Sequence, residues 1–406
     1  MTHHQTIPAM ALLLATAAPL AAQASLAATL GGAFDSYRPL AGASESRRNF
    51  VGTLSADHVF SAGRGRVFYD FGVGNYDSPG DWSYRLHAAG ASYRLGGSDS
   101  SGRRVTLTGS LASRRNGDAW TSADYTAMGA GINMELHPRT ATTLRSGYRA
   151  DLHRFGDLAA LTQAEHRVFA SVLSSFRTRT SVILEGQLGA KTYDGVVYTE
   201  VAPVIVADSV SSTLHGRGYG AGMGPGVRYT TLPGVSWSSQ RGTAGMGSVR
   251  GRIAQSLTDR TGVTLEATVR RTFGSVPPLL VTTPAGFFED GVYDDPFASD
   301  GLFLEAGIKH VFASAAEVAA SGWWANKDYS SASAFDASGV SAAGSALRSD
   351  RVTMGTVTWT TPLLSTMTGA VALSAEFGYR FIRHRSMDAY YNYTSHALSA
   401  GISVAY

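Results

Sequence analysis

The sequence has no cysteine among its 406 residues, and only 16% of them are charged. The absence of cysteine excludes disulfide bonds and a thiol nucleophile. Neither Gly-x-Ser-x-Gly nor His-Glu-x-x-His occurs, so common serine-hydrolase and zinc-protease motifs are missing. The net charge of +3 is small, and lysine and arginine form no basic block. We therefore expect no catalytic residues, no metal, no cofactor and no nucleic-acid partner.

Long apolar runs are also missing. After residue 20 no stretch reaches eighteen apolar residues, which excludes membrane-spanning helices. Ile7 to Leu20 is apolar but too short and alanine-rich to span a bilayer stably, and Ala22-Gln23-Ala24 has the small-x-small pattern of a signal-peptidase site. We predict a signal peptide over 1–24, with a buried or anchoring helix as the alternative.

Glycine and aromatic residues are abundant, with 46 Gly, 18 Tyr, 17 Phe and 6 Trp. This composition suits strands with one apolar and one polar face. The stretches at 182–190, 263–270 and 371–381 alternate between apolar residues on one face and mostly polar or small residues on the other. Such ten-residue alternation, repeated along the chain, is typical of tilted strands that cross a membrane.

A weak internal repeat sets the phase of these strands. The segments 135–148, 175–188 and 256–269 align without gaps, and each contains an Arg-Thr pair between two alternating stretches. Short turns of this kind join antiparallel neighbours, and in membrane barrels they lie on the periplasmic side.

Extending this phase predicts about sixteen strands, with both termini on the periplasmic side. The expected strands are 29–38, 48–60, 66–76, 82–95, 103–115, 121–136, 141–154, 164–177, 181–194, 241–257, 261–274, 301–312, 316–328, 349–360, 368–385 and 392–406. We predict an all-β fold, an antiparallel up-and-down transmembrane β-barrel over 25–406. Residues 195–240 would form one long loop, although 216–229 could add a strand pair and make eighteen. Other long outward loops would be 275–300 and 329–348.

The last residues carry a second signal. Leu398, Ala400, Ile402, Val404 and Tyr406 alternate up to a terminal aromatic residue. This pattern resembles the C-terminal strand of bacterial outer-membrane proteins, in which Phe is commoner than Tyr at the end. The resemblance implies location in the outer membrane and recognition by the barrel-assembly machinery through Leu398, Ile402, Val404 and Tyr406. It also implies contact with outer-membrane lipid and lipopolysaccharide, and allows a homo-oligomer or a periplasmic export partner.

If the apolar face meets lipid, the other face lines a lumen that side chains of a sixteen-strand barrel are too short to fill. The predicted lumen residues are Arg85, Arg145, Arg149, Glu185, Arg250, Arg252, Glu266, Arg270, Lys309, Glu376 and Arg380. Their basic excess would favour anionic or hydroxyl-rich solutes. Alternatively, these charges pair across strands and stiffen the wall.

Three further features leave alternatives open. The glycine-rich stretch 216–226 could fold into the lumen as a constriction or lie outside as a loop. The acidic residues of 286–300 could hold calcium, but their spacing matches no defined calcium loop and favours a solvated surface. Asp151 and His153 could share a face at the outer rim, which keeps an enzymatic barrel as a less favoured alternative.

The preferred functional hypothesis is a channel, either for small solutes or for export of a polymer such as an exopolysaccharide. The alternative is a non-conducting surface or assembly protein in which the barrel is an anchor and the extracellular loops carry the function.

Overall fold

The computed structural model describes residues 23–39, 45–60, 64–77, 83–95, 102–117, 121, 124–156, 162–194, 197–209, 227–238, 242–274, 295–334, 346–365 and 372–405. Within these residues no helix is both long enough and apolar enough to cross a membrane. The predicted signal peptide lies almost entirely outside them.

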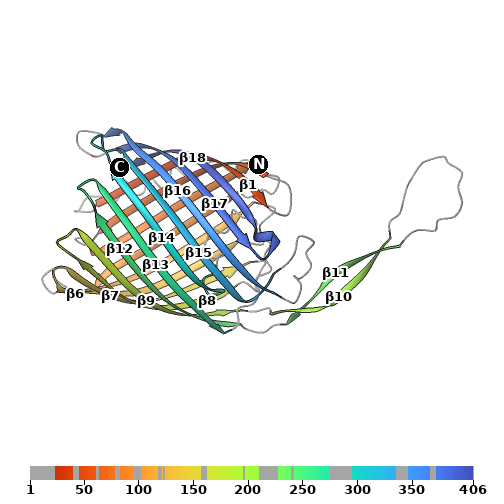
Figure 1. The fold of residues 1–406 in the computed structure, drawn as a ribbon. Helices are drawn as coiled ribbons and strands as arrows, with labels where there is room; N and C mark the ends of the chain where they lie inside the picture. The colour runs from red at the N-terminus through yellow and green to blue at the C-terminus, as the bar shows by residue number, and fades with distance from the viewer. Residues whose placement is uncertain are drawn as a thin grey trace.

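A closed antiparallel barrel contains most of the described chain (Figure 1). Sixteen strands form it, in the number and order that the alternation predicted. They are β1 (Gln23–Pro39), β2 (Glu45–Phe60), β3 (Gly65–Asp77), β4 (Tyr84–Leu95), β5 (Arg103–Asn116), β6 (Tyr125–Arg139), β7 (Thr142–Phe155), β8 (Gln163–Ser175), β9 (Thr180–Tyr193), β12 (Thr243–Ser256), β13 (Thr261–Gly274), β14 (Ser299–Val311), β15 (Glu317–Ser333), β16 (Leu347–Ser365), β17 (Ala372–Ser386) and β18 (Tyr393–Ala405). The barrel closes where β1 pairs with β18.

The two ends of the barrel differ in their connections. At one end, β6–β7, β8–β9, β12–β13 and β14–β15 are joined by turns of two to five residues, including the three Arg-Thr turns. The chain enters β1 and leaves β18 at this same end, since Ala27 pairs with Ala405. Longer connections lie at the opposite end, which we call the loop end. This arrangement is the one expected when short turns face the periplasm.

Large apolar side chains cover the outer face of the barrel. Examples in five strands are Leu111, Leu188, Val249, Leu265 and Leu398, whose exposed fractions range from 50% to 61%. They occupy every second position, because successive side chains of a strand point to opposite faces. A closed sheet with an apolar exterior leaves no backbone edge unpaired, as the membrane interior requires.

The described residues of 195–240 add no strand to the barrel, as the long-loop prediction expected, but they contain two strands that the sequence analysis did not predict. Two strands, β10 (Val197–Ser209) and β11 (Val227–Ser238), form a separate two-stranded sheet. The hairpin projects away from the loop end of the barrel in Figure 1. The eighteen-strand alternative is therefore wrong, because β9 pairs directly with β12. The glycine-rich stretch 216–226 lies outside the described residues.

A glycine on the inner face of β4 holds an aromatic ring against the backbone. A Cβ built at Gly90 would lie 2.5 Å from the Phe68 ring and 2.7 Å from the Gly109 carbonyl oxygen. Phe68 is the cross-strand partner of Gly90, and its ring occupies the space over the position that lacks a side chain. Glycine is required here by close approach.

We expect Gly90→Ala to lower the free energy of unfolding by about 1–3 kcal/mol, because the backbone of β5 cannot move away as a side chain could. Urea titration followed by tryptophan fluorescence measures this loss. The matched control is Gly186→Ala, since a Cβ at Gly186 meets nothing within 4 Å. Equal stability of the two variants would contradict the packing explanation.

Candidate functional site

The inner face of the barrel carries most of the charged residues that the sequence assigned to a lumen. Each of them alternates with an exposed apolar neighbour or is the register partner of a residue that does; Arg250, for example, follows exposed Val249 and pairs with Glu185. The structure places on this face Arg145, Arg149, Glu185, Arg250, Arg252, Glu266, Arg270, Lys309, Glu376 and Arg380.

The prediction that Arg85 lines the lumen is wrong. Arg85 occupies the same face of β4 as the exposed Tyr93 and Leu95, and its register partner is the exposed Arg115. Both arginines therefore point outward. Arg85 is the second residue of β4 at the loop end, where an outward side chain reaches water or lipid headgroups. Near the loop end of the barrel, polar side chains occur on both the outer and the inner face. The alternation of polar and apolar residues therefore assigned Arg85 to the wrong face.

Many inner charges form ion pairs across neighbouring strands. The Arg250 Nε atom lies 2.8 Å from Glu266 Oε1, and its Nη1 atom lies 3.9 Å from Glu185 Oε1. On the neighbouring strands β6 and β7, Glu135 accepts from Arg145 at 3.0 Å, and these two residues border the same hollow as Arg250 and Glu185. Charges of neighbouring strands therefore pair along the wall; that these pairs stiffen it stays a prediction.

Some inner arginines are left over from this pairing. Arg94 and Arg252 take part in no ion pair among the residues that the structure describes. Arg252 borders a hollow of about 420 Å³ together with Glu305 and Lys309. Arg94 borders a second hollow, of about 530 Å³, beside Arg145 and others. Cations therefore face open space in two hollows of the inner face.

The segment just before β14 folds into the barrel at the loop end. Lys191 on β9 forms an ion pair with Asp295 at 2.8 Å, and the exposed fractions of these side chains are 2% and 7%. The Tyr193 hydroxyl donates to the same carboxylate. Phe297, fully buried, packs beside Tyr193 and Met246. We call Asp295–Ala298 the inward segment.

The inward segment reaches across the wall. It leads into β14, yet its contacts lie on β9 and β12, beyond the intervening strand β13. The Phe297 ring occupies the space in front of Gly189, where an added Cβ would lie 2.7 Å from it. The prediction that 275–300 is an outward loop is therefore wrong for its described end. The buried ion pair holds this end inside the barrel.

A second charged cluster lies on the inner face of β16 and β17 at the loop end. Asp350, with no exposed side-chain surface, accepts hydrogen bonds from the Arg348 guanidinium, from His384 Nε2 at 2.9 Å and from Ser386 Oγ at 2.6 Å. The Arg348 guanidinium lies 3.3 Å from the centre of the Tyr391 ring. Burial raises the pKa of this phenol above its usual value. Sequence reasoning missed the cluster.

The geometry of these groups does not resemble a hydrolase site. In the Asp350 cluster the carboxylate bonds both the histidine and the serine, so neither side chain activates the other. Asp151 and His153 do share the inner face, but Asp151 accepts from Arg149 at 2.6 Å. These acid-histidine neighbours show no nucleophile beside a base.

The acidic loop shows cation partners where it is described. Asp295 pairs with Lys191, and Asp300 pairs with Arg271 at 2.7 Å. The other predicted acids, Glu289, Asp290 and Asp294, lie outside the described residues. Within the described part of the chain, no group of three or more His, Cys, Asp or Glu side chains could hold a metal ion.

The C-terminal strand presents its apolar residues to the exterior. Leu398 and Ile402 are 59% and 50% exposed, and Val404 is 39% exposed. Tyr406 lies outside the described residues. The role of these residues as an assembly signal stays a prediction.

A closed sixteen-strand barrel with an apolar exterior, a charged interior and its short turns at one end is the architecture of proteins that cross the bacterial outer membrane by strands. The protein is an outer-membrane β-barrel. No protein-family model matches it, and no curated protein matches it in sequence.

Solved outer-membrane barrels resemble this barrel in structure. OccAB1 of Acinetobacter baumannii is 10% identical with a TM-score of 0.49, and the match covers 94% of this chain and 96% of that one. OpdO of Pseudomonas aeruginosa is also 10% identical, with a TM-score of 0.47 and coverage of 94% and 97%. A bacterial polysaccharide outer membrane secretin is 11% identical, with a TM-score of 0.44 and coverage of 94% and 97%.

Proposed function

We propose that this outer-membrane barrel is a channel for small anionic or hydroxyl-rich solutes. The observation that carries the proposal is that two inner cations, Arg94 and Arg252, border open space and form no ion pair with any residue that the structure describes. Guanidinium groups in such positions attract anions and donate hydrogen bonds to hydroxyl groups.

The width of the barrel supports a solute path. Side chains fill the interior of a barrel of about eight strands, whereas sixteen-strand barrels leave an aqueous lumen unless other segments plug it. The inward segment supplies a constriction, because Asp295 and Phe297 are held against β9 at the loop end. A solute would pass this constriction and then the unpaired arginines.

We expect Arg252→Glu to shift the reversal potential in asymmetric salt toward cations, with the permeability ratio changing severalfold. Arg252 takes part in no ion pair among the described residues, so the substitution breaks none. Planar-bilayer recording of the purified barrel measures this shift. Arg85→Glu is the matched control, because that arginine points outward. A silent bilayer with a folded wild-type barrel would reject the channel proposal.

One observation favours a second candidate. The β10–β11 hairpin stands outside the barrel and contributes no strand to it. A surface or assembly protein would use this hairpin and need no open lumen. Deleting 197–238 would then abolish binding to a partner, while a channel would keep its conductance without the hairpin.

A further inference from the structure

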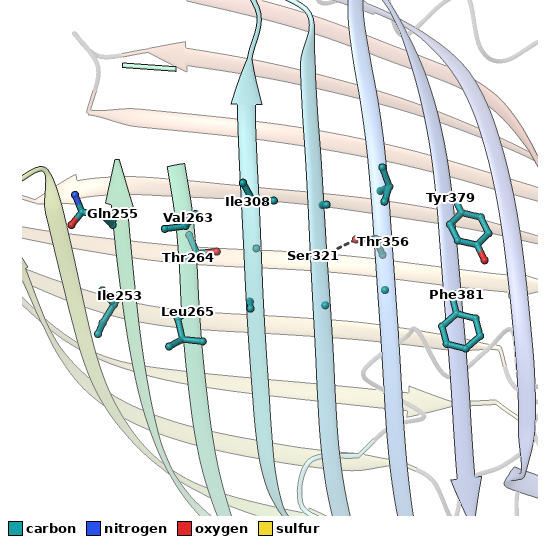
Figure 2. A pocket seen from close by; sticks show the side chains of 16 residues that line it. Ile253, Gln255, Val263, Thr264, Leu265, Ile308, Ser321, Thr356, Tyr379 and Phe381 are labelled. Atoms are coloured by element: carbon teal, nitrogen blue, oxygen red, sulfur yellow. Dashed lines mark hydrogen bonds between the residues drawn. The ribbon is translucent and has the colours of Figure 1, made fainter. Parts of the chain in front are cut away.

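The outer face of the barrel contains an apolar groove of about 670 Å³ across β12 to β17. Its floor is a row of small residues in direct register, in which Ala306 pairs with Gly322 and Gly322 pairs with Gly355. Leu265 closes the row on β13 and Phe381 closes it on β17. Figure 2 shows Tyr379 and Phe381 on one side of the groove and Val263 and Leu265 on the other.

The floor of the groove is open. A Cβ added at Gly322 would meet nothing within 4 Å, and one added at Gly355 would meet only the Ser321 carbonyl oxygen, at 4.0 Å. The neighbouring outer positions hold large side chains, among them Val357, which is 46% exposed, and Ile308, which is 48% exposed. A hollow of this kind on a lipid-facing surface is shaped to receive hydrocarbon.

Three outward arginines lie on the loop side of the groove. Arg383 is the next outward residue after Phe381 on β17, and Arg385 is the one after that. Arg351 on β16 is the register partner of Arg385, so their Cα atoms lie about 5 Å apart. All three side chains are exposed. We call Arg351, Arg383 and Arg385 the arginine cluster.

The arginine cluster has no anionic partner within the described residues. None of its members forms an ion pair there. The acid on the neighbouring outer face of β15 is Asp328, whose carboxylate accepts from Ser349 and Asn326. By contrast, the other outward arginine pair, Arg85 and Arg115, includes an ion pair from Arg115 to Asp124.

Like charges in directly opposed positions of a sheet destabilise it unless an anion lies between them. Three guanidinium groups near the headgroup level, each with several donors, match a phosphate group in charge and in hydrogen-bonding capacity. The apolar groove on the membrane side of the arginines matches an acyl chain in its apolar character. The site therefore complements an amphiphile that has an anionic headgroup and an apolar tail.

We propose that the arginine cluster and the groove form one binding site for lipopolysaccharide of the outer leaflet. The arginines contact the phosphates of its lipid moiety, and an acyl chain lies over Gly322 and Gly355. Long loops mark the extracellular side, so the cluster faces the leaflet in which this phosphorylated glycolipid resides.

The test measures binding of fluorescent lipopolysaccharide to the detergent-purified, folded barrel. We expect the triple variant Arg351→Gln, Arg383→Gln, Arg385→Gln to bind about a hundredfold more weakly, at about fivefold for each arginine near a charged headgroup. Gly322→Leu fills the groove and should weaken binding about tenfold without loss of stability, since its side chain enters open space.

The matched controls lie elsewhere on the outer face. Arg85→Gln with Arg115→Gln removes two outward arginines, and Gly186→Leu adds an outward leucine on β9 where a Cβ meets nothing within 4 Å. Both should retain wild-type affinity. Dephosphorylated lipopolysaccharide should bind the wild type and the triple variant equally, and excess inorganic phosphate should not displace the intact glycolipid.

Three outcomes would overturn the proposal. The first is equal lipopolysaccharide affinity in the wild type, the triple variant and Gly322→Leu. The second is an equal loss in the control variants, which would show nonspecific adsorption. The third is a homo-oligomer, detected by native mass spectrometry, that Gly322→Leu dissociates, since a second copy would then occupy the groove. Channel conductance is independent of all three outcomes.

Discussion

Lys191→Met is expected to lower the free energy of unfolding by about 3–5 kcal/mol, because it leaves a buried carboxylate without its charged partner. Asp295 is 7% exposed, and the hydrogen-bond donors that it would keep among the described residues, the Tyr193 hydroxyl and the Phe297 amide, are neutral. The same change should detach the inward segment from β9. Single-channel conductance should therefore rise together with the loss of stability.

Urea titration and planar-bilayer recording measure these two effects. The double variant Lys191→Met, Asp295→Leu removes both charges and should recover most of the stability, since a buried apolar pair can replace a buried ion pair. Lys309→Met is the control for a lumen ion pair that is partly exposed, because Lys309 and Glu317 are 56% and 34% exposed. It should cost less than about 1 kcal/mol. An equal cost for Lys309→Met and Lys191→Met would refute the role of burial.

The second large effect concerns the Asp350 cluster. We expect Asp350→Ala to cost about 3–5 kcal/mol, because Arg348 and His384 are then buried without the carboxylate that binds both. Arg348 is only 11% exposed, so water cannot replace the lost partner. The loss should loosen the contact between Tyr391 and the rim at the loop end.

Heat-modified migration on gels, with the midpoint recorded for each variant, measures this loss. Asp259→Ala is the control, because Asp259 is 83% exposed and pairs with Arg179 in a turn. Its midpoint should match that of the wild type. Asp350→Asn retains one acceptor for Arg348 or His384 and should fall between the two. Equal midpoints for Asp350→Ala and Asp259→Ala would show that the Asp350 cluster does not stabilise the rim.

The sequence allowed the barrel to be predicted almost strand by strand. The predicted bounds of 261–274 coincide with β13, and those of 103–115 fall one residue short of the end of β5. Outward residues must be apolar wherever lipid surrounds the wall, so the period of two is enforced along each strand. The tight Arg-Thr turns then identify the periplasmic end of the barrel.

The remaining features lie where that constraint is absent. Arg85 sits above the lipid band, where either face tolerates charge. The Lys191–Asp295 pair joins residues 104 positions apart across two intervening strands, and no local pattern encodes such a contact. The groove depends on Gly322 and Gly355 coming into register, which requires the pairing of β15 with β16 to be known.

The direct pairing of β9 with β12 has a consequence for how this protein can change. The whole stretch between them enters and leaves the wall at one point, so its length does not alter the circumference or the stagger of the barrel. Such a stretch can be lengthened, exchanged or replaced by an unrelated module while the wall folds as before. The loop end of the barrel thus contains an insertion point, where a segment with new surface chemistry can be added without redesign of the membrane-embedded part.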